Sequence, residues 1–79
     1  MITKDDLRNW VARALHDLGG EASIVDVAKW IWDRHESDLR GSGSMFYKWQ
    51  YEMRWAAQSL VKEGKLNKTS ERGVWKLLR

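Results

Sequence analysis

Apolar side chains recur at spacings of three and four residues between Leu7 and Leu18. This period places them on one face of an amphipathic helix. Thr3 has the side chain of a helix N-cap, and it precedes two aspartates that suit a first helical turn. Gly19 and Gly20 follow the last apolar position and favour a helix end. The sequence therefore predicts a first helix that begins after Thr3 and ends at the glycine pair.

Apolar residues continue at helical spacing from Ile24 onward. Ser23 stands three residues before Asp26, an arrangement similar to a capping box, and is therefore expected to cap a second helix. We expect this helix to run to about His35. The connection between the two helices has room only for a tight turn or one short β-bridge at residues 21–23.

Residues 36–44 are predicted to form a flexible loop that ends with Ser44 as the N-cap of a third helix. Within this loop, residues 41–44 read Gly-Ser-Gly-Ser, which is typical of a tag linker as well as of a natural loop. From Met45 the helical period returns, and Gly64 is expected to stop it. The predicted inner face of the third helix is apolar and consists of Phe46, Trp49, Met53, Ala56, Ala57 and Leu60.

The C-terminal residues form two short segments around a polar turn. Residues 65–68 and 74–78 are predicted to be strands, joined as a β-hairpin. In the second strand Trp75 and Leu77 share one face, while Lys76 points the other way. The hairpin thus has one side that can pack on the helices.

Three helices followed by a hairpin are the element order of a winged helix-turn-helix fold. We therefore predict a mainly α fold with a small β-hairpin, in which the two C-terminal strands form the wing and residues 21–23 form either a tight turn or a third short strand. A chain of 79 residues with 43% apolar side chains holds one small core, so we expect a single domain over residues 1–79. Five of the six tryptophans are assigned to core or near-core packing: Trp10, Trp30, Trp32, Trp49 and Trp75.

Composition narrows the classes of function. The chain has no cysteine and two separated histidines, which gives no thiolate site and no convincing metal site. Its carboxylates lie at predicted helix ends and in a loop, where capping and solvation explain them. There is also no phosphate-binding loop and no nucleophile motif. We therefore expect that the chain is not an enzyme and takes no cofactor.

Membrane insertion and export are not expected either. No apolar run is long enough to span a bilayer. The N-terminus lacks the basic and apolar regions of a signal peptide. We therefore expect a soluble, cytoplasmic protein without a membrane partner.

The net charge of +3 is unevenly distributed along the chain. Residues 1–43 carry six basic and eight acidic side chains, a net charge of −2. Residues 44–79 carry eight basic and three acidic side chains, a net charge of +5. The third helix and the hairpin both lie in the basic part, so a polyanion is expected to bind there.

The basic part also resembles the end of the N-terminal domain of Mrr-type restriction proteins. The resemblance rests on Arg54-Trp55-Ala56-Ala57, Leu60, Glu63-Gly64-Lys65-Leu66 and Arg72-Gly73-Val74-Trp75-Lys76-Leu77. The first helix with its glycine pair and residues 23–31 fit the same pattern more loosely, whereas residues 36–45 match no motif of it. Those domains are winged helices, generally fused to a nuclease domain, in a family concerned with modified DNA. The resemblance implies DNA recognition by this module and cleavage by a fused or associated nuclease domain.

The predicted outer face of the third helix mixes cations, amides and aromatic rings. Arg54 is suited to pair with guanine, and Gln50 or Gln58 with adenine. Lysines on this face and in the hairpin are suited to phosphates, as is the Ser44 hydroxyl beside the free N–H groups of the helix start. The predicted contacts with double-stranded DNA are Ser44, Tyr47, Lys48, Gln50, Tyr51, Arg54, Gln58, Lys68, Ser70 and Arg72. The alternative for each polar residue is an ordinary solvated side chain, and for Ser44 an ordinary N-cap.

The sequence allows two roles for Trp55 and two classes of function for the aromatic face. For Trp55 we favour packing under the wing or against the first helix, and the alternative is contact with a base, which suits a reader of modified or flipped bases. A protein-binding or homodimerising winged helix is the other class of function, because Tyr47, Tyr51, Arg54 and Trp55 are of residue types that protein interfaces favour. The salt dependence of binding distinguishes the two classes of function, since phosphate binding weakens steeply as the salt concentration rises.

Overall fold

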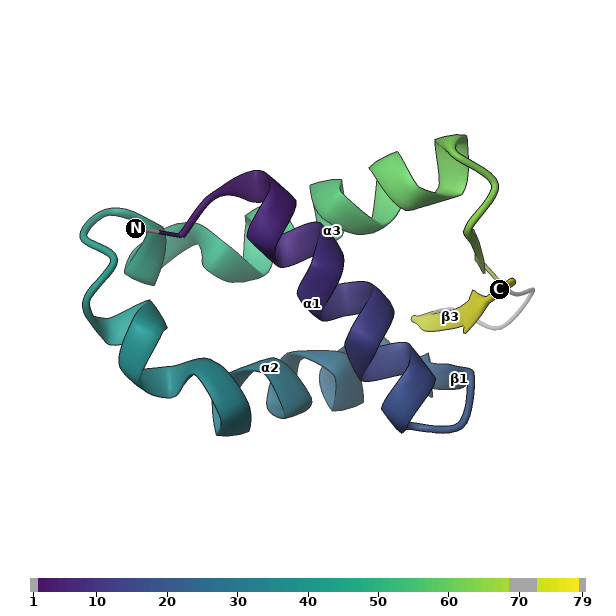
Figure 1. Cartoon of the computed structure of the whole chain (residues 1–79), viewed down its shortest axis with the longest axis horizontal. Helices are drawn as coiled ribbons and strands as arrows, with labels where there is room; N and C mark the ends of the chain where they lie inside the picture. Colours follow the sequence, from purple (N-terminus) through teal and green to yellow (C-terminus); the bar gives the residue numbers. More distant parts are fainter. Residues whose placement is uncertain (1, 69–72, 79) are drawn as a thin grey trace.

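The computed structural model describes residues 2–68 and 73–78, and this part of the chain contains three helices and three short strands. In chain order these elements are α1 (Lys4–Asp17), β1 (Glu21–Ser23), α2 (Ile24–Arg40), α3 (Met45–Lys62), β2 (Leu66–Lys68) and β3 (Val74–Leu77). Figure 1 shows α1 crossing between α2 and α3, with the strands gathered at one end of the helices. The mainly helical content and the element order confirm the predicted winged helix-turn-helix arrangement.

The first helix, α1, begins and ends where the sequence predicts. The Thr3 hydroxyl accepts a hydrogen bond from the Asp6 backbone N–H (3.1 Å), and the Thr3 N–H donates to the Asp6 carboxylate (3.0 Å). These two bonds form a capping box. After Asp17 the chain turns at Gly19 and Gly20, whose φ angles of 95° and 96° lie in the region that favours glycine. This turn leads the chain into β1.

A three-stranded antiparallel sheet follows the order β1-β3-β2, with β3 in the centre. Ala22 of β1 lies opposite Trp75, and Leu66 of β2 lies opposite Leu77. Trp75 is buried and Leu77 is half-buried, whereas Lys76 is exposed. The predicted hairpin and its alternation are therefore confirmed, and of the two alternatives for residues 21–23 the structure has the short strand.

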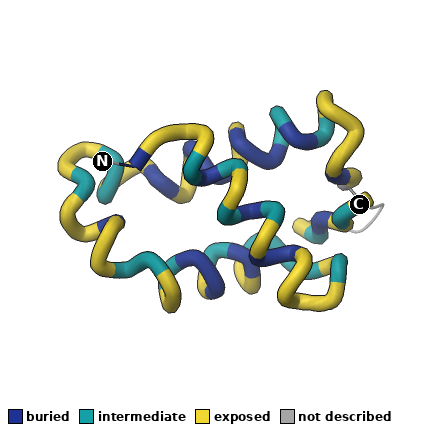
Figure 2. Tube along the Cα trace, in the orientation of Figure 1, coloured by how far each residue is buried: buried dark blue, intermediate teal, exposed yellow. Residues whose placement is uncertain are grey.

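One hydrophobic core joins the three helices to the sheet. Figure 2 shows that buried and exposed stretches alternate along each helix. Trp30, Trp49 and Trp75 belong to the core, while Trp10 and Trp32 pack against it half-buried. The rings of Trp32 and Trp49 are nearly parallel, with centroids 6.2 Å apart, and this pair links α2 to α3. All five tryptophans assigned to the core or its margin therefore lie there.

The predicted loop at residues 36–44 was wrong in length, because α2 continues to Arg40. Leu39 is fully buried, so the last turn of the helix is anchored in the core. Arg40 donates a hydrogen bond to the Glu36 carboxylate one turn earlier (2.7 Å). Only residues 41–44 connect α2 to α3.

A bend in α2 lies at His35, the residue where the helix was predicted to end. The His35 backbone (φ −125°, ψ 20°) is outside the helical region. Its imidazole stacks on the Trp10 indole of α1, with ring centroids 3.8 Å apart and planes 9° apart. Its Nδ1 lies 3.5 Å from the Asp38 carboxylate. The helix therefore bends where a ring contact holds it against α1, and it resumes beyond that contact.

Ser44 precedes α3 but does not cap it, which corrects the predicted N-cap. Its backbone is already helical (φ −63°, ψ −25°), and its side chain makes no capping hydrogen bond. The Ser44 carbonyl instead accepts a hydrogen bond from the Tyr47 N–H (3.1 Å). A capping hydroxyl needs an extended backbone to reach the N–H groups of the first turn, and Ser44 lacks that conformation.

Thr3 and Ser44 therefore form a matched pair for mutation. We expect Thr3→Ala to lower the free energy of unfolding by about 1 kcal/mol, because it removes one half of the capping box. We expect Ser44→Ala to change it by less than about 0.5 kcal/mol, since no capping bond is lost. Urea unfolding followed by circular dichroism measures both values. Equal losses in the two variants would contradict these cap assignments.

Candidate nucleic-acid interface

The two faces of α3 divide as the helical period predicts. Its buried positions are Trp49, Glu52, Met53, Ala56, Ala57 and Leu60, all apolar except Glu52. Phe46, which was assigned to the inner face, is only half-buried. The positions that point away from the core are Tyr47, Lys48, Gln50, Tyr51, Arg54, Trp55 and Lys62, which are exposed, and Gln58, which is half-buried. We call these eight residues the outer face of α3.

Three cations lie on the outer face: Lys48, Arg54 and Lys62. Within residues 2–68 and 73–78, none of them forms an ion pair, in contrast to Lys4 and Arg8 of α1, which do. A cation that is exposed and unpaired loses no interaction when a phosphate approaches it. The outer face can therefore bind an anion without breaking an ion pair.

The acidic residue of α3 is directed away from the outer face. Glu52 is about nine-tenths buried, and its Oε2 atom lies 3.7 Å from the Lys4 ammonium of α1. Glu63, the first residue after the helix, forms an ion pair with Arg8 and another with Lys65 (3.5 Å). The outer face of α3 consequently carries no carboxylate to repel an anion. The sequence analysis did not single out Glu52, although its position three residues after Trp49 and four before Ala56 places it beside the apolar band.

Three aromatic side chains on the outer face are strongly exposed: Tyr47 at 87%, Tyr51 at 61% and Trp55 at 55%. The exposure of Trp55 corrects the prediction that it packs under the wing or against α1. Ala56 and Ala57 occupy the buried positions next to it, and the indole remains outside that band. Tyr51 and Trp55 contact each other edge to face, with ring centroids 6.2 Å apart and planes 70° apart.

A shallow hollow of about 510 Å³ lies along this part of α3. Its lining consists of Tyr51, Arg54, Trp55, Gln58 and Lys62. The hollow thus combines two aromatic rings, two cations and an amide on a single helix. This combination suits a planar ligand that carries negative charge.

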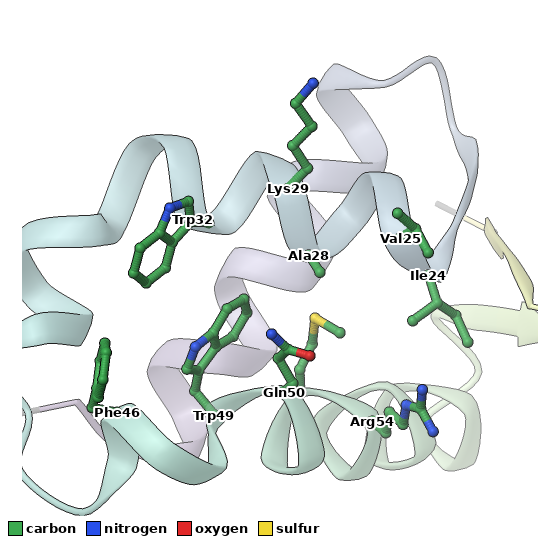
Figure 3. A pocket seen from close by; sticks show the side chains of 10 residues that line it. Ile24, Val25, Ala28, Lys29, Trp32, Phe46, Trp49, Gln50 and Arg54 are labelled. Carbon is green, nitrogen blue, oxygen red and sulfur yellow. The ribbon is translucent and has the colours of Figure 1, made fainter.

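A second hollow, a groove of about 600 Å³, lies between α2 and α3 (Figure 3). Its walls are mainly apolar and include Trp32 of α2 and Phe46 and Trp49 of α3. Gln50 and Arg54 also line it, so the groove borders the outer face of α3. Figure 3 shows Lys29 pointing away from α3, whereas the Gln50 amide points into the groove.

The structure brings together most, but not all, of the predicted DNA contacts. Tyr47, Lys48, Gln50, Tyr51, Arg54 and Gln58 share the outer face of α3, and Ser44 is exposed just before that helix. Lys68 is the last residue of β2, opposite Trp75, and its side chain lies outside the described part of the chain. Ser70 and Arg72, the other predicted wing contacts, also lie outside the described residues.

Among the described residues, no cluster of three or more histidine, aspartate or glutamate side chains is arranged to hold a metal ion. In the same part of the chain, no helix has the length and apolar character needed to cross a membrane.

Comparison of the chain with protein-family models, with curated proteins and with solved structures found no match.

Proposed function

We propose that this chain is a module that binds double-stranded DNA, with α3 in the major groove and the wing on the phosphate backbone. One observation carries the proposal. Within residues 2–68 and 73–78, the outer face of α3 presents three cations that form no ion pair, and it carries no carboxylate, because Glu52 is buried against α1. A helix of this kind fits the width of a B-form major groove, and its charge complements the phosphates.

Within this proposal the residues of α3 divide by task. Arg54 is long enough to reach guanine O6 and N7, and Gln50 or Gln58 pairs with adenine. Lys48 binds phosphate, as does the Ser44 hydroxyl, which makes no capping hydrogen bond. In the wing, Lys68, Ser70 and Arg72 contact the backbone. The resemblance to Mrr-type restriction proteins supports a place for this module beside a fused or associated nuclease domain.

Fluorescence anisotropy of a labelled duplex tests the proposal. We expect binding at about 50 mM salt that weakens steeply by about 200 mM, because each bound phosphate releases counterions. Binding that is insensitive to salt, or no binding at the lower concentration, would contradict it.

Arg54→Ala is the single substitution that we expect to weaken binding most selectively. The loss should be about tenfold or more and should depend on the duplex sequence, because a guanidinium that pairs with guanine carries sequence information. The matched control is Arg13→Ala, which removes an exposed arginine of α1 that pairs with Asp17. The same anisotropy titration should leave the control unchanged. Equal affinities of both variants for every duplex would remove Arg54 from the interface.

A protein-binding module is the second candidate function, and the groove between α2 and α3 favours it. The groove is mainly apolar and walled by aromatic rings, and Val25 at its margin is 75% exposed. Another chain, including a second copy of this one, would cover such a surface with apolar side chains. That association would respond little to salt, so the two-salt titration separates the candidates.

A further inference from the structure

The exposed aromatic residues of α3 are evenly spaced. Tyr47, Tyr51 and Trp55 follow one another at intervals of four residues, so they lie along one side of the helix. An α-helix rises about 1.5 Å per residue, and these positions therefore recur about every 6 Å along its axis. We call these three residues the aromatic stripe.

An intact duplex does not present base faces on which all three rings could stack. Stacked bases of one strand are about 3.4 Å apart, and the major groove offers only their edges and methyl groups. Positions that recur about every 6 Å, with the Tyr51 and Trp55 ring centroids 6.2 Å apart, match bases that have separated from one another. Aromatic faces of this kind hold unpaired bases in proteins that bind single strands.

The rings and charges beside the stripe fit the same ligand. The planes of Tyr51 and Trp55 are 70° apart, so the two rings do not clamp one base between them and instead serve as separate platforms. The hollow beside them adds Arg54 and Lys62, whose cations lie within reach of the phosphates that flank a base. Separate aromatic platforms, with cations beside them that form no ion pair within residues 2–68 and 73–78, match a strand of unpaired nucleotides.

We infer that the aromatic stripe of α3 binds unpaired bases, so that DNA containing an unpaired segment is the preferred ligand of this surface. The inference rests on the proposed function, since it assumes that the outer face of α3 contacts DNA. It adds to that function a class of substrate: single-stranded DNA, or a duplex that is locally open. Lys48, Arg54 and Lys62 then neutralise the backbone on either side of the bases held by the rings.

Anisotropy titrations with four labelled probes of equal length test the inference. The probes are a perfect duplex, a duplex with a short internal mismatch bubble, a DNA single strand, and an RNA strand of the same sequence. We expect the bubble and the DNA strand to bind at least fivefold more tightly than the perfect duplex. Equal or tighter binding of the perfect duplex would overturn the inference and leave the proposed function standing. Failure of every probe to bind would overturn both, and a preference for RNA over the DNA strand would overturn the assignment to DNA.

Substitutions in the aromatic stripe test whether these rings cause the preference for unpaired DNA. Trp55→Ala should lower affinity for the bubble about tenfold, because one stacking platform is lost, and should leave affinity for the perfect duplex within about twofold. Trp55→Phe keeps an aromatic ring and should retain most of the preference. Leu18→Ala, which removes an exposed apolar side chain at the C-terminal end of α1, should have no effect. A ratio of bubble to duplex affinity that is unchanged in Trp55→Ala and in Tyr51→Ala would overturn the inference.

Discussion

Trp75→Ala should lower the free energy of unfolding by about 3–5 kcal/mol, which is the usual cost of replacing a buried tryptophan. Trp75 is 3% exposed and stands in β3, the central strand, opposite Ala22 of β1 and Lys68 of β2. Its indole therefore helps to hold the sheet on the helices. A domain of 79 residues has a total stability of about 4–12 kcal/mol, so this single change removes a large part of it.

Trp55→Ala is the matched control for that experiment, because it removes the same side chain from an exposed position. Trp55 is 55% exposed on α3, and we expect its loss to cost less than about 1 kcal/mol. Urea unfolding followed by the helical circular dichroism signal gives both values. If the two variants lost equal stability, the placement of one tryptophan inside and the other outside the core would be incorrect.

Reversing the three cations of the outer face should produce the largest loss of DNA binding. In the variant Lys48→Glu, Arg54→Glu, Lys62→Glu, two contacts with phosphates and one contact with a base edge become repulsive. We expect affinity for any duplex to fall by more than about a hundredfold. The slope of log affinity against log salt should also become shallower by about two, since about one counterion is released for each phosphate that a lysine neutralises.

A second triple variant controls for the overall change in charge. Arg13→Glu, Arg34→Glu, Arg40→Glu reverses three exposed cations on α1 and α2 and changes the net charge equally. Arg13 and Arg40 form surface ion pairs with Asp17 and Glu36, and Arg34 and Arg40 lie over the rings of Trp30 and Trp32. Each such contact is worth about 1 kcal/mol or less, so the fold should be retained, which the helical circular dichroism signal checks. Anisotropy at one salt concentration compares the two variants. Similar losses of affinity would mean that binding depends on net charge alone and not on the outer face of α3.

The sequence was sufficient to predict the elements whose periodicity is unbroken. In α1 and α3 the apolar positions recur at helical spacing without interruption, and in β3 the alternation around Lys76 marks a strand with one buried face. Polar residues at the expected positions supplied the caps at Thr3 and Ser23, and both form the predicted side-chain bonds. Local patterns and tertiary contacts agree in these segments, and such agreement makes a sequence easy to interpret.

The end of α2 was missed because a tertiary contact interrupts the helical period there. His35 is not an apolar residue, yet its stack on Trp10 makes it part of the packed surface. With His35 included, Ile31, His35 and Leu39 follow at intervals of four, which predicts one further turn. A contact between two helices was therefore needed to interpret that spacing.

The candidate site was predicted in part. The exposure of Lys48, Tyr51 and Arg54 follows from the helical wheel, because α3 has one clearly apolar side. The environment of that face did not follow from it. The burial of Glu52 beside Lys4 depends on how α1 crosses α3, and the exposure of Trp55 depends on how much of the helix surface α1 covers. A local sequence pattern encodes neither how α1 crosses α3 nor how much of the surface of α3 it covers.

Chemical-shift mapping of the isotopically labelled chain with a short DNA duplex most directly tests whether α3 carries the interface. A spectrum of backbone amides resolves single residues in a protein of this size, so one titration reports both binding and its location. We expect the largest shifts along the outer face of α3, at Tyr47, Lys48, Tyr51 and Arg54, with small shifts in α1. Shifts confined to α1, or to the groove between α2 and α3 without the outer face, would contradict the proposed interface.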